Sequence, residues 1–435
     1  MVEHAAFSQG LLHASARAQA RAVAAGRVSA ASLLQCQLDA VRSRNPQLNA
    51  YIAQPATPAL ESGTSPLAGS SFAAKDNFDV AGLPTASGLR AMSRIAMRDA
   101  PVVARLRGAG LACLGKLNMH AMALGATNHN PDFGDCFNPR RAGFTPGGSS
   151  GGSGAAVAAG LCGIALGTDT MGSVRVPAAY CGVVGFKPSH ETLGLEGVQT
   201  LCRWLDHAGL LARSVEDIEA AMRICAPHLG AMDPPAVSDL RLGVVQDLAA
   251  LGADVEVAAA FDAALARLRQ VFGCTLQAVR LDQLDLGATR RAGLLLCEAE
   301  LHPVLAPVLL ERPDVLPADL LAMMRHVERK SAPDLGLALE RAARTGEELD
   351  RLTQDLDALL LPTTPQQAFP MRSPVPRNQA DFTALANMNG APAISLPLPV
   401  TADALPVGLQ LIGRRGHDLA LLQLAARVES ALSGP

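Results

Sequence analysis

The sequence predicts an α/β protein in which helices cover both faces of a β-sheet. Short apolar runs typical of buried strands alternate along the chain with longer amphipathic segments typical of helices. Hydrophobic residues make up 49% of the 435 residues, enough for a sizeable core, whereas aromatic residues make up only 3%. We therefore expect one large domain, with a core built mainly from Ala, Leu and Val.

The N-terminal part of the chain predicts two helices followed by a loop and a strand. The helices are expected within residues 6–45, with Ser29 as the N-cap of the second helix. Residues 54–70 are rich in Pro, Ser and Gly, which indicates a surface loop. The strand expected at 71–74 leads directly into Lys75, and strand ends are where α/β folds place their chemistry.

The next segment surrounds a run of glycines and serines. We expect a helix, a short strand and another helix over 101–124, then a loop rich in Pro, Gly and Asn over 130–145. Residues 151–160 predict a helix whose free N-terminal N–H groups point back at Ser149 and Ser150. The elements expected after this helix are a buried strand at 161–166 and a turn at 168–173.

The second half of the chain continues the alternation. Ser214 is expected to cap a helix over 214–224, with Asp217 in an arrangement like a capping box. A Pro-rich link at 232–235 follows, and 289–346 is expected to be mostly helical. Breaks are expected in that region at Pro303, Pro307, Pro313 and Pro317. The other expected elements are strands at 241–245, 357–361, 393–398 and 407–412 and helices at 255–272 and 418–432.

Charge and cysteine usage exclude several classes of protein. The net charge is -3 and there is no basic cluster, which argues against nucleic acid or an anionic membrane as partner. No uninterrupted apolar run has the length of a membrane span, and no signal peptide is apparent at the N-terminus. The nine cysteines form an odd set without a Cys-x-x-Cys pair, so we expect a reducing, cytoplasmic setting and no zinc site.

One stretch, residues 147–189, combines many small residues with few charged ones. It opens with Gly-Gly-Ser-Ser-Gly-Gly-Ser-Gly. A flexible linker is excluded because apolar runs follow at once, and a phosphate-binding P-loop is excluded because no lysine opens the next helix. Tight packing alone would not ask for hydroxyl groups, which need partners once buried. The serines concerned are Ser149, Ser150, Ser153 and Ser173.

This stretch resembles the long signature of the amidase signature family of serine hydrolases. The resemblance extends to Ala-Lys-Asp-Asn at 74–77, Leu-Asp-His-Ala-Gly at 205–209 and Leu-Pro-Val-Gly-Leu-Gln at 405–410, and it is weakest between about 225 and 355. It implies one amidase domain over 1–435 with a mixed central sheet. The parts of that domain would be N-terminal helices and a loop at 1–70, a catalytic core at 71–224, a divergent helical region at 225–355 and a return to the sheet at 356–435.

Hydrolysis of an amide through an acyl-enzyme needs a nucleophile, a base, an acid for the departing nitrogen and donors for the oxyanion. The resemblance places the nucleophile on Ser173, the base on Lys75 and a bridging serine on Ser149, behind a cis peptide bond from Gly148. A lysine with a pKa near ~10.4 would stay charged, so burial must lower its pKa. Asp76 must then point elsewhere, because a paired carboxylate would raise the lysine pKa.

Further residues of the signature are expected to support this group. Arg175 is expected to pair with Asp169, because a buried arginine needs a carboxylate. Two positions depart from the family pattern: Met171, where Gly or Ala is usual, and Ala121, where many relatives carry Glu. The backbone N–H groups expected to form an oxyanion hole are those of Thr170, Met171, Gly172 and Ser173. The expected supporting residues are Ser150, Asp169 and Arg175.

Two rival sites are weaker. A thiol site would pair Cys136 or Cys181 with a histidine, but small buried cysteines are common core residues. The histidines available for such a pair are His120, His129 and His207. A metal site at His120, His129 and Asp132 lacks a His-x-x-x-His pair or an acidic cluster. We expect neither a metal nor a cofactor.

The resemblance implies three candidate functions. The first is an amidohydrolase that cleaves the C–N bond of a small carboxamide or ureide-type substrate and releases ammonia or an amine. The second is the glutaminase subunit of a tRNA-dependent amidotransferase, and the third is an inactive binding protein of the same fold. For the first, the expected partner is a small amide. A homodimer is an expected assembly because homodimers are common among similar enzymes.

Overall fold

The computed structural model describes residues 10–230, 240–274, 276–401 and 403–433, and the Pro-rich link predicted at 232–235 lies outside them. In this part of the chain eleven strands form one mixed sheet, and β3 (Pro84–Thr85) and β4 (Arg94–Ile95) form a small second sheet. In order across the large sheet, the strands are β1 (Tyr51–Ala53), β5 (Ala112–Leu117), β2 (Ser71–Lys75), β6 (Ile164–Asp169), β8 (His207–Ala212), β7 (Val184–Lys187), β12 (Ala393–Pro397), β13 (Gly408–Ile412), β11 (Ala358–Pro362), β9 (Leu242–Val245) and β10 (Leu276–Val279).

The pairing of β2 decides where the chemistry lies. Strand β2 runs parallel to both neighbours, β5 and β6, so the carboxyl ends of these three strands meet at one edge of the sheet. Strand β9 is likewise parallel to β10 and β11, whereas the strands between β6 and β11 are antiparallel to their neighbours. The sheet joins strands from both halves of the chain, and the finer division at residues 70, 224 and 355 stays a prediction.

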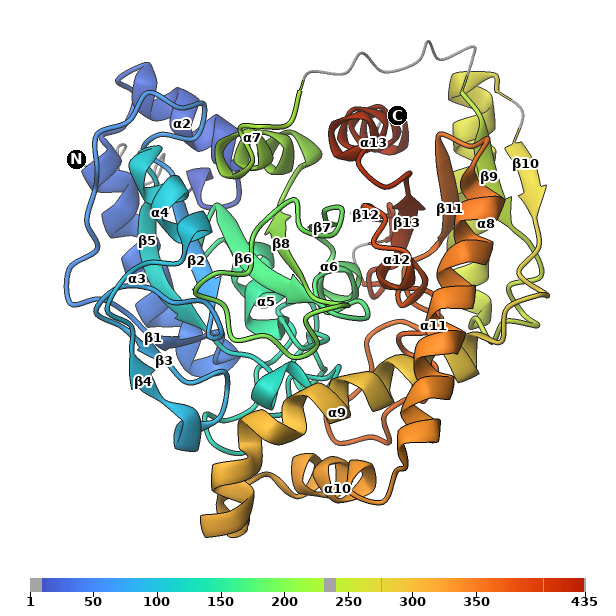
Figure 1. Ribbon diagram of the computed structural model, residues 1–435. Helices are drawn as coiled ribbons and strands as arrows, with labels where there is room; N and C mark the ends of the chain where they lie inside the picture. Colours follow the sequence, from blue (N-terminus) through green and yellow to red (C-terminus); the bar gives the residue numbers. More distant parts are fainter. Residues whose placement is uncertain (1–9, 231–239, 275, 402, 434–435) are drawn as a thin grey trace.

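Helices cover both faces of the sheet, as predicted (Figure 1). Alternate residues of the central strands enter different cores: Ala73 and Ala165 face the core that contains α3, α5 and α6, while Phe72 and Leu166 face the core that contains α4, α7 and α13. The helices are α2 (Ala16–Ala24), α3 (Ala30–Leu48), α4 (Pro101–Gly108), α5 (Gly151–Ala158), α6 (Arg175–Cys181), α7 (Val215–Cys225), α8 (Val255–Phe272), α9 (Leu286–Glu311), α10 (Ala318–Val327), α11 (Ala332–Thr353), α12 (Leu385–Met388) and α13 (Asp418–Ser433).

Both predicted N-caps are present, but the capping box at α7 is only half formed. Ser29 accepts a hydrogen bond from the N–H of Ser32 at 3.0 Å, and Ser214 accepts one from the N–H of Asp217 at 3.2 Å. The Asp217 carboxylate does not return to Ser214. It accepts instead from the N–H groups of Ala16 (2.9 Å) and Arg17 (2.8 Å), because the first turn of α2 lies against α7 and lacks acceptors of its own.

The helical region after residue 286 is less interrupted than its prolines suggest. Helix α9 continues through Pro303 and Pro307, although a proline inside a helix costs about 3 kcal/mol. Its buried side chains, which include Leu301 and Leu305, pack in a core shared with α10 and α11 and offset this cost. The predicted breaks do occur at Pro313, which opens a short 3-10 turn (Pro313–Val315), and at Pro317, which precedes α10.

Helix α9 is, among the described residues, the one helix long and apolar enough to cross a membrane by length and composition alone. It lies with α10 and α11 at one end of the molecule, and its apolar side chains belong to the shared core (Figure 1). This is the pattern of a core helix rather than a membrane span.

The second helix predicted within 101–124 is only a 3-10 turn (Ala121–Ala123). Met122 and Ala123 have positive φ angles of 51° and 60°, which no helix tolerates. The backbone bonds of this segment go elsewhere: the N–H of Met122 donates to Ser87 O at 2.8 Å, and the N–H of His120 donates to Ser149 O at 3.1 Å. The turn thus helps to hold the serine loop.

Replacing Asp217 with alanine should lower the free energy of unfolding by about 1–3 kcal/mol, because the N–H groups of Ala16 and Arg17 lose their acceptor. Urea-induced unfolding measures the change. The matched control is Glu219→Ala on the same helix, which removes only a surface pair with Arg223 and should cost no more than about 0.5 kcal/mol. Equal shifts for the two variants would show that Asp217 does not join α2 to α7.

Candidate active site

The predicted catalytic residues gather at the carboxyl edge of β2 and β6. Lys75 is the last residue of β2, and Thr168 and Asp169 end β6, so the strand extends two residues into the turn predicted at 168–173. Ala74 pairs with Leu166 in the parallel ladder, which brings Lys75 opposite Thr168. The loop that ends at Ser150 approaches the same edge just before α5.

Lys75 is completely buried and contacts two hydroxyl groups. Its Nζ donates to Ser149 Oγ at 2.7 Å and to Thr168 Oγ1 at 2.7 Å. Burial lowers the pKa of the lysine from 10.5 to about 7, against the opposing charges of Asp206 and Asp169. A substantial fraction of Lys75 is therefore neutral near pH 7, as a base requires.

The neighbouring Asp76 points away from Lys75, as the sequence predicted. Its carboxylate lies 3.3 Å from Nζ of Lys116 and accepts from the N–H of Gly88 at 2.9 Å. Burial raises the pKa of Asp76, while Lys116 opposes that rise. Because Lys116 takes this carboxylate, no acid pairs directly with Lys75, and nothing cancels the effect of its burial.

The loop that carries Ser149 is fixed by its backbone. The Gly148–Ser149 peptide bond is cis, as the resemblance implies. A side chain at Gly148 would lie 2.8 Å from the backbone nitrogen of Thr127, so only glycine fits there. Contrary to the prediction, the N–H groups at the start of α5 do not point at the serines. Those of Gly151 and Gly152 donate to Asn128 Oδ1 (3.0 Å) and Asn118 O (3.1 Å), because these asparagines reach the helix end first.

Ser173 lies in the wall of a cavity of about 250 Å³ and is partly exposed. Its hydroxyl makes no hydrogen bond to any described residue, and Ser149 is therefore linked to Lys75 but not yet to Ser173. Ser150 holds the two loops together: its N–H donates to Ser173 O at 3.2 Å and its hydroxyl to Thr168 O at 3.2 Å. Ser150 thus has the supporting position predicted for it.

The turn before Ser173 is shaped around Asp169. The N–H of Gly172 donates to Asp169 Oδ1 at 2.8 Å, so this group is engaged, and its assignment to the oxyanion hole is wrong. The N–H groups of Met171 and Ser173 make no hydrogen bond within the described part of the chain. Gly172, rather than Met171, has the positive φ (127°), and a side chain there would collide with Thr383. Met171 therefore fits the turn without backbone strain.

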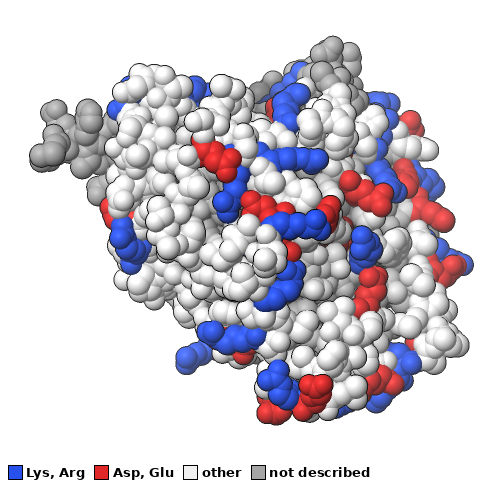
Figure 2. Space-filling view, turned by 60° about the vertical axis from the view of Figure 1, so that its left-hand side comes forward, with Lys and Arg blue, Asp and Glu red and all other residues white. Residues whose placement is uncertain are grey.

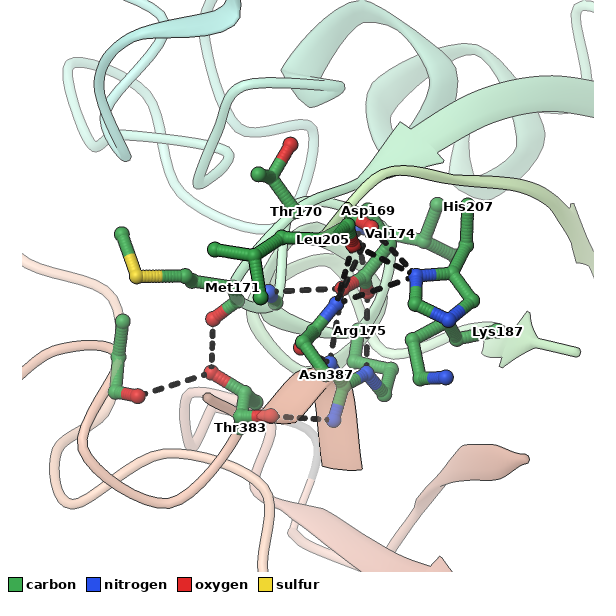
Figure 3. Close-up of polar contacts among 12 residues, drawn as sticks. Asp169, Thr170, Met171, Val174, Arg175, Lys187, Leu205, His207, Thr383 and Asn387 are labelled. Carbon is green, nitrogen blue, oxygen red and sulfur yellow. Dashed lines mark hydrogen bonds and ion pairs between the residues drawn. The ribbon is translucent and has the colours of Figure 1, made fainter. Parts of the chain in front are cut away.

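Arg175 and Asp169 form the predicted pair, and both are fully buried (Figure 3). Arg175 donates from Nε to Asp169 Oδ2 (3.0 Å) and from Nη2 to Oδ1 (2.8 Å). Burial alone would raise the pKa of Asp169, but the charge and hydrogen bonds of Arg175 hold it well below the usual range. The sequence did not predict the other partners of Arg175, which are Thr383 O (2.8 Å), Gln410 Oε1 (2.6 Å) and Asn387 Oδ1 (2.7 Å).

Asp206 is a further residue that sequence reasoning did not assign to the site. It accepts from the hydroxyl of Thr170 at 2.5 Å and from the N–H of Leu201 at 2.7 Å. Burial raises its pKa to about 6, so the carboxylate is mostly ionised near pH 7 and fixes the first residue of the turn. Its place in the Leu-Asp-His-Ala-Gly motif at 205–209 was the available signal.

The rival sites have no comparable geometry. Burial raises the pKa of Cys181 to about 12 and the pKa of Cys136 well above its usual range, so both thiols stay protonated. His129 pairs with Asp135 at 2.7 Å, while Asp132 accepts from the N–H of Arg90. Among the described residues no three His, Cys, Asp or Glu side chains are arranged to hold a metal ion.

Comparisons with known proteins agree with this geometry. Residues 27–422 match the family model of amidases. A subunit of the glutamyl-tRNA(Gln) amidotransferase of Anaeromyxobacter sp. (strain K) is 32% identical over 95% of this chain and 95% of its own. A crystal structure of an amidase has a TM-score of 0.85 and 30% identity, covering 95% of this chain and 99% of that one. The substrate complex of 6-aminohexanoate cyclic dimer hydrolase has a TM-score of 0.83 and 29% identity, covering 97% and 98%.

The chain therefore belongs to the amidase signature family, which confirms both the resemblance and the predicted fold. It is an enzyme of that family. Its relatives include amidotransferase subunits as well as hydrolases, so the particular reaction has to be argued from the site.

Replacing Arg175 with methionine should destabilise the protein by about 3–5 kcal/mol, because the Asp169 carboxylate would stay buried without its partner. Thermal and urea unfolding measure the change. Arg223→Met is the matched control, since it removes a surface ion pair with Glu219 and should cost about 0–1 kcal/mol. If Arg175→Met is as stable as that control, the buried pair does not hold the turn.

Proposed function

We propose that this protein hydrolyses the C–N bond of a small carboxamide or ureide-type substrate through an acyl-enzyme on Ser173. The observation that carries the proposal is Lys75, which is fully buried, has a pKa of about 7 and contacts Ser149 at 2.7 Å. A neutral lysine next to a hydroxyl group, beside a cavity that contains a second serine, is equipped for proton transfer to and from a nucleophile.

The reaction follows from these positions. Oγ of Ser173 attacks the carbonyl carbon while its proton passes to Ser149, whose own proton passes to neutral Lys75. The carbonyl electrons move to oxygen, which the N–H groups of Met171 and Ser173 receive, with Thr170 as a further donor of the same turn. The C–N bond then breaks as Lys75 returns the proton through Ser149 to the departing nitrogen. Water attacks the acyl group by the same relay and releases the acid.

The open Ser149–Ser173 step does not oppose this mechanism. Catalytic hydrogen bonds are often long before substrate binds and tighten in the complex with substrate. The cavity beside Ser173, at about 250 Å³, is smaller than the pockets that hold drug-sized ligands, which favours a small substrate. Met171 lines this cavity, so its side chain takes space that Gly or Ala would leave to the substrate.

A second candidate is the glutaminase subunit of a tRNA-dependent amidotransferase, favoured by the name of the relative from Anaeromyxobacter and its match over 95% of both chains. By sequence this candidate has the stronger support. The charge of the cavity favours the first candidate. Glutamine carries an ammonium group that needs a carboxylate, and the described residues that line the cavity include Arg290 and Arg377 but neither Asp nor Glu.

We further propose a small molecule as the main partner, a cytoplasmic setting and, as one possible assembly, a homodimer. All nine cysteines are free, which supports a reducing compartment. On the face shown in Figure 2, basic side chains are interspersed with acidic ones instead of forming a patch of one sign, which does not favour nucleic acid as a partner.

Replacing Ser173 with alanine should lower kcat at least about 1,000-fold while leaving the fold intact, because the acyl-enzyme cannot form. Steady-state assays measure the loss, and a fluorophosphonate should label Ser173 in the wild type. Ser153→Ala is the control, because its buried hydroxyl donates only to Leu166 O at 2.9 Å. Activity of Ser173→Ala within about tenfold of the wild type, or labelling of a cysteine, would exclude Ser173 as the nucleophile.

The role of Lys75 predicts a pH dependence. Only neutral Lys75 accepts a proton, and its neutral fraction grows with pH, so kcat/KM should rise through an apparent pKa near 7 and level off above it. Lys75→Arg should lose nearly as much activity as Lys75→Ala, about 100-fold or more, because a guanidinium stays protonated. Retention of most activity by Lys75→Arg would show that the residue is only a structural cation.

The two candidate functions separate in one assay. The purified chain, alone, is given glutamine and a panel of small amides, ureas and carbamoyl acids, and ammonia release is measured. The proposed function expects Ser173-dependent turnover of a small amide and little turnover of glutamine. Efficient glutamine hydrolysis, or activity only after addition of partner subunits, would support the amidotransferase reading instead.

A further inference from the structure

One wall of the catalytic cavity is a loop between β11 and α12. Residues 375–380 of this loop face Ser173 across the cavity, and the opposite walls are formed largely by apolar side chains such as Leu124, Val176 and Leu294. Two arginines, Arg290 and Arg377, are the charged residues among the described cavity lining. Their different environments indicate what the cavity can bind.

Arg290 already has a partner. Its Nε lies 2.7 Å from Oδ1 of Asp381, and both side chains are largely buried. This pair is close to neutral, so Arg290 adds little net charge to the cavity. Arg377 is exposed and forms no ion pair with any described residue. The unmatched positive charge of the cavity therefore comes from Arg377.

A second unmatched group lies two residues further along the same loop. Gln379 is only 3% exposed, and its Nε2 donates to Ala126 O at 2.8 Å. Its Oε1 is buried without a hydrogen-bond partner among the described residues. Buried acceptors are rarely left unpaired in proteins, and Gln379 lines the cavity, so a bound molecule with an N–H group would satisfy it.

On the basis of the proposed function, we propose that the substrate is an amide that also carries a carboxylate, which Arg377 binds at the cavity wall. Gln379 Oε1 accepts from an N–H of the same substrate. Monoamides of dicarboxylic acids and N-carbamoyl acids have both groups. An amide with an ammonium group in place of the carboxylate would face Arg377 with like charge and is rejected.

The test uses matched substrates that differ only in charge. Succinamate carries the carboxylate, its methyl ester is neutral, and 3-aminopropanamide carries an ammonium group. Malonamate, glutaramate and adipamate, each with its methyl ester, vary the distance between the amide and the carboxylate. The wild type should prefer the best anion of the series over its ester by about tenfold or more in kcat/KM, mainly through KM, and should turn over 3-aminopropanamide least. Added salt should weaken only the preference for the anion.

Variants of Arg377 assign the preference to this residue. Arg377→Gln should raise KM for the best anion about tenfold and leave kcat/KM for its ester within about twofold, and Arg377→Lys should restore part of the preference because it keeps the charge. Arg372→Gln is the control: Arg372 is exposed on the same loop but does not line the cavity, and its loss should change nothing.

The outcomes also separate this proposal from the proposed function. Turnover of neutral amides with no preference for the anions, or a preference that survives Arg377→Gln, overturns the carboxylate proposal while amide hydrolysis stands. If neither anions nor neutral amides are hydrolysed in a Ser173-dependent way, the proposed function fails, and the carboxylate proposal fails with it.

Discussion

Burial of a lysine amine in a site without a paired acid is the constraint on which this structure depends. A charged amine that leaves water loses hydration, and an unpaired one lowers that cost by releasing its proton. At Lys75 the loss is large enough to bring the pKa to about 7, even though Asp206 and Asp169 pull it upward. The surrounding structure keeps those carboxylates occupied elsewhere: Asp169 by Arg175, Asp206 by Thr170, and Asp76 by Lys116.

The same distribution of charge shapes the turn that presents Ser173. Asp169 accepts from Arg175 and from the N–H of Gly172, so one carboxylate neutralises a buried cation and also orders the backbone before Ser173. Arg175 in turn binds Asn387 and Gln410 from the C-terminal part of the chain. A segment more than 200 residues away in sequence is thereby attached to the turn, which couples the stability of the sheet to the geometry of the site.

Much of this arrangement could be predicted from the sequence, because its signals are local. Strand ends, N-caps and the spacing within residues 147–189 placed Lys75, Ser149 and Ser173, and the pairing of Arg175 with Asp169 needed only a short separation. Most of the predicted strands and helices agree closely with those observed.

What escaped prediction depends on contacts across the fold. Thr168 contacts Lys75 only because β2 and β6 are adjacent, and Asn387 reaches Arg175 only through the order of strands in the sheet. Helix α9 continued through Pro303 because packing outweighed a local propensity. The N–H of Gly172 was misassigned because the sequence does not show that Asp169 folds back onto its own turn.

The pKa of Lys75 can be measured directly, because the chain has only four lysines: Lys75, Lys116, Lys187 and Lys330. Protein labelled with ¹³C at lysine Cε gives few NMR signals, and a Lys75→Arg variant identifies the one that belongs to Lys75. Titration of that signal should show a midpoint near pH 7, far below the midpoint of exposed Lys330. A midpoint above about 9 would mean that Lys75 is charged near neutral pH, and the account of a neutral lysine base would be wrong.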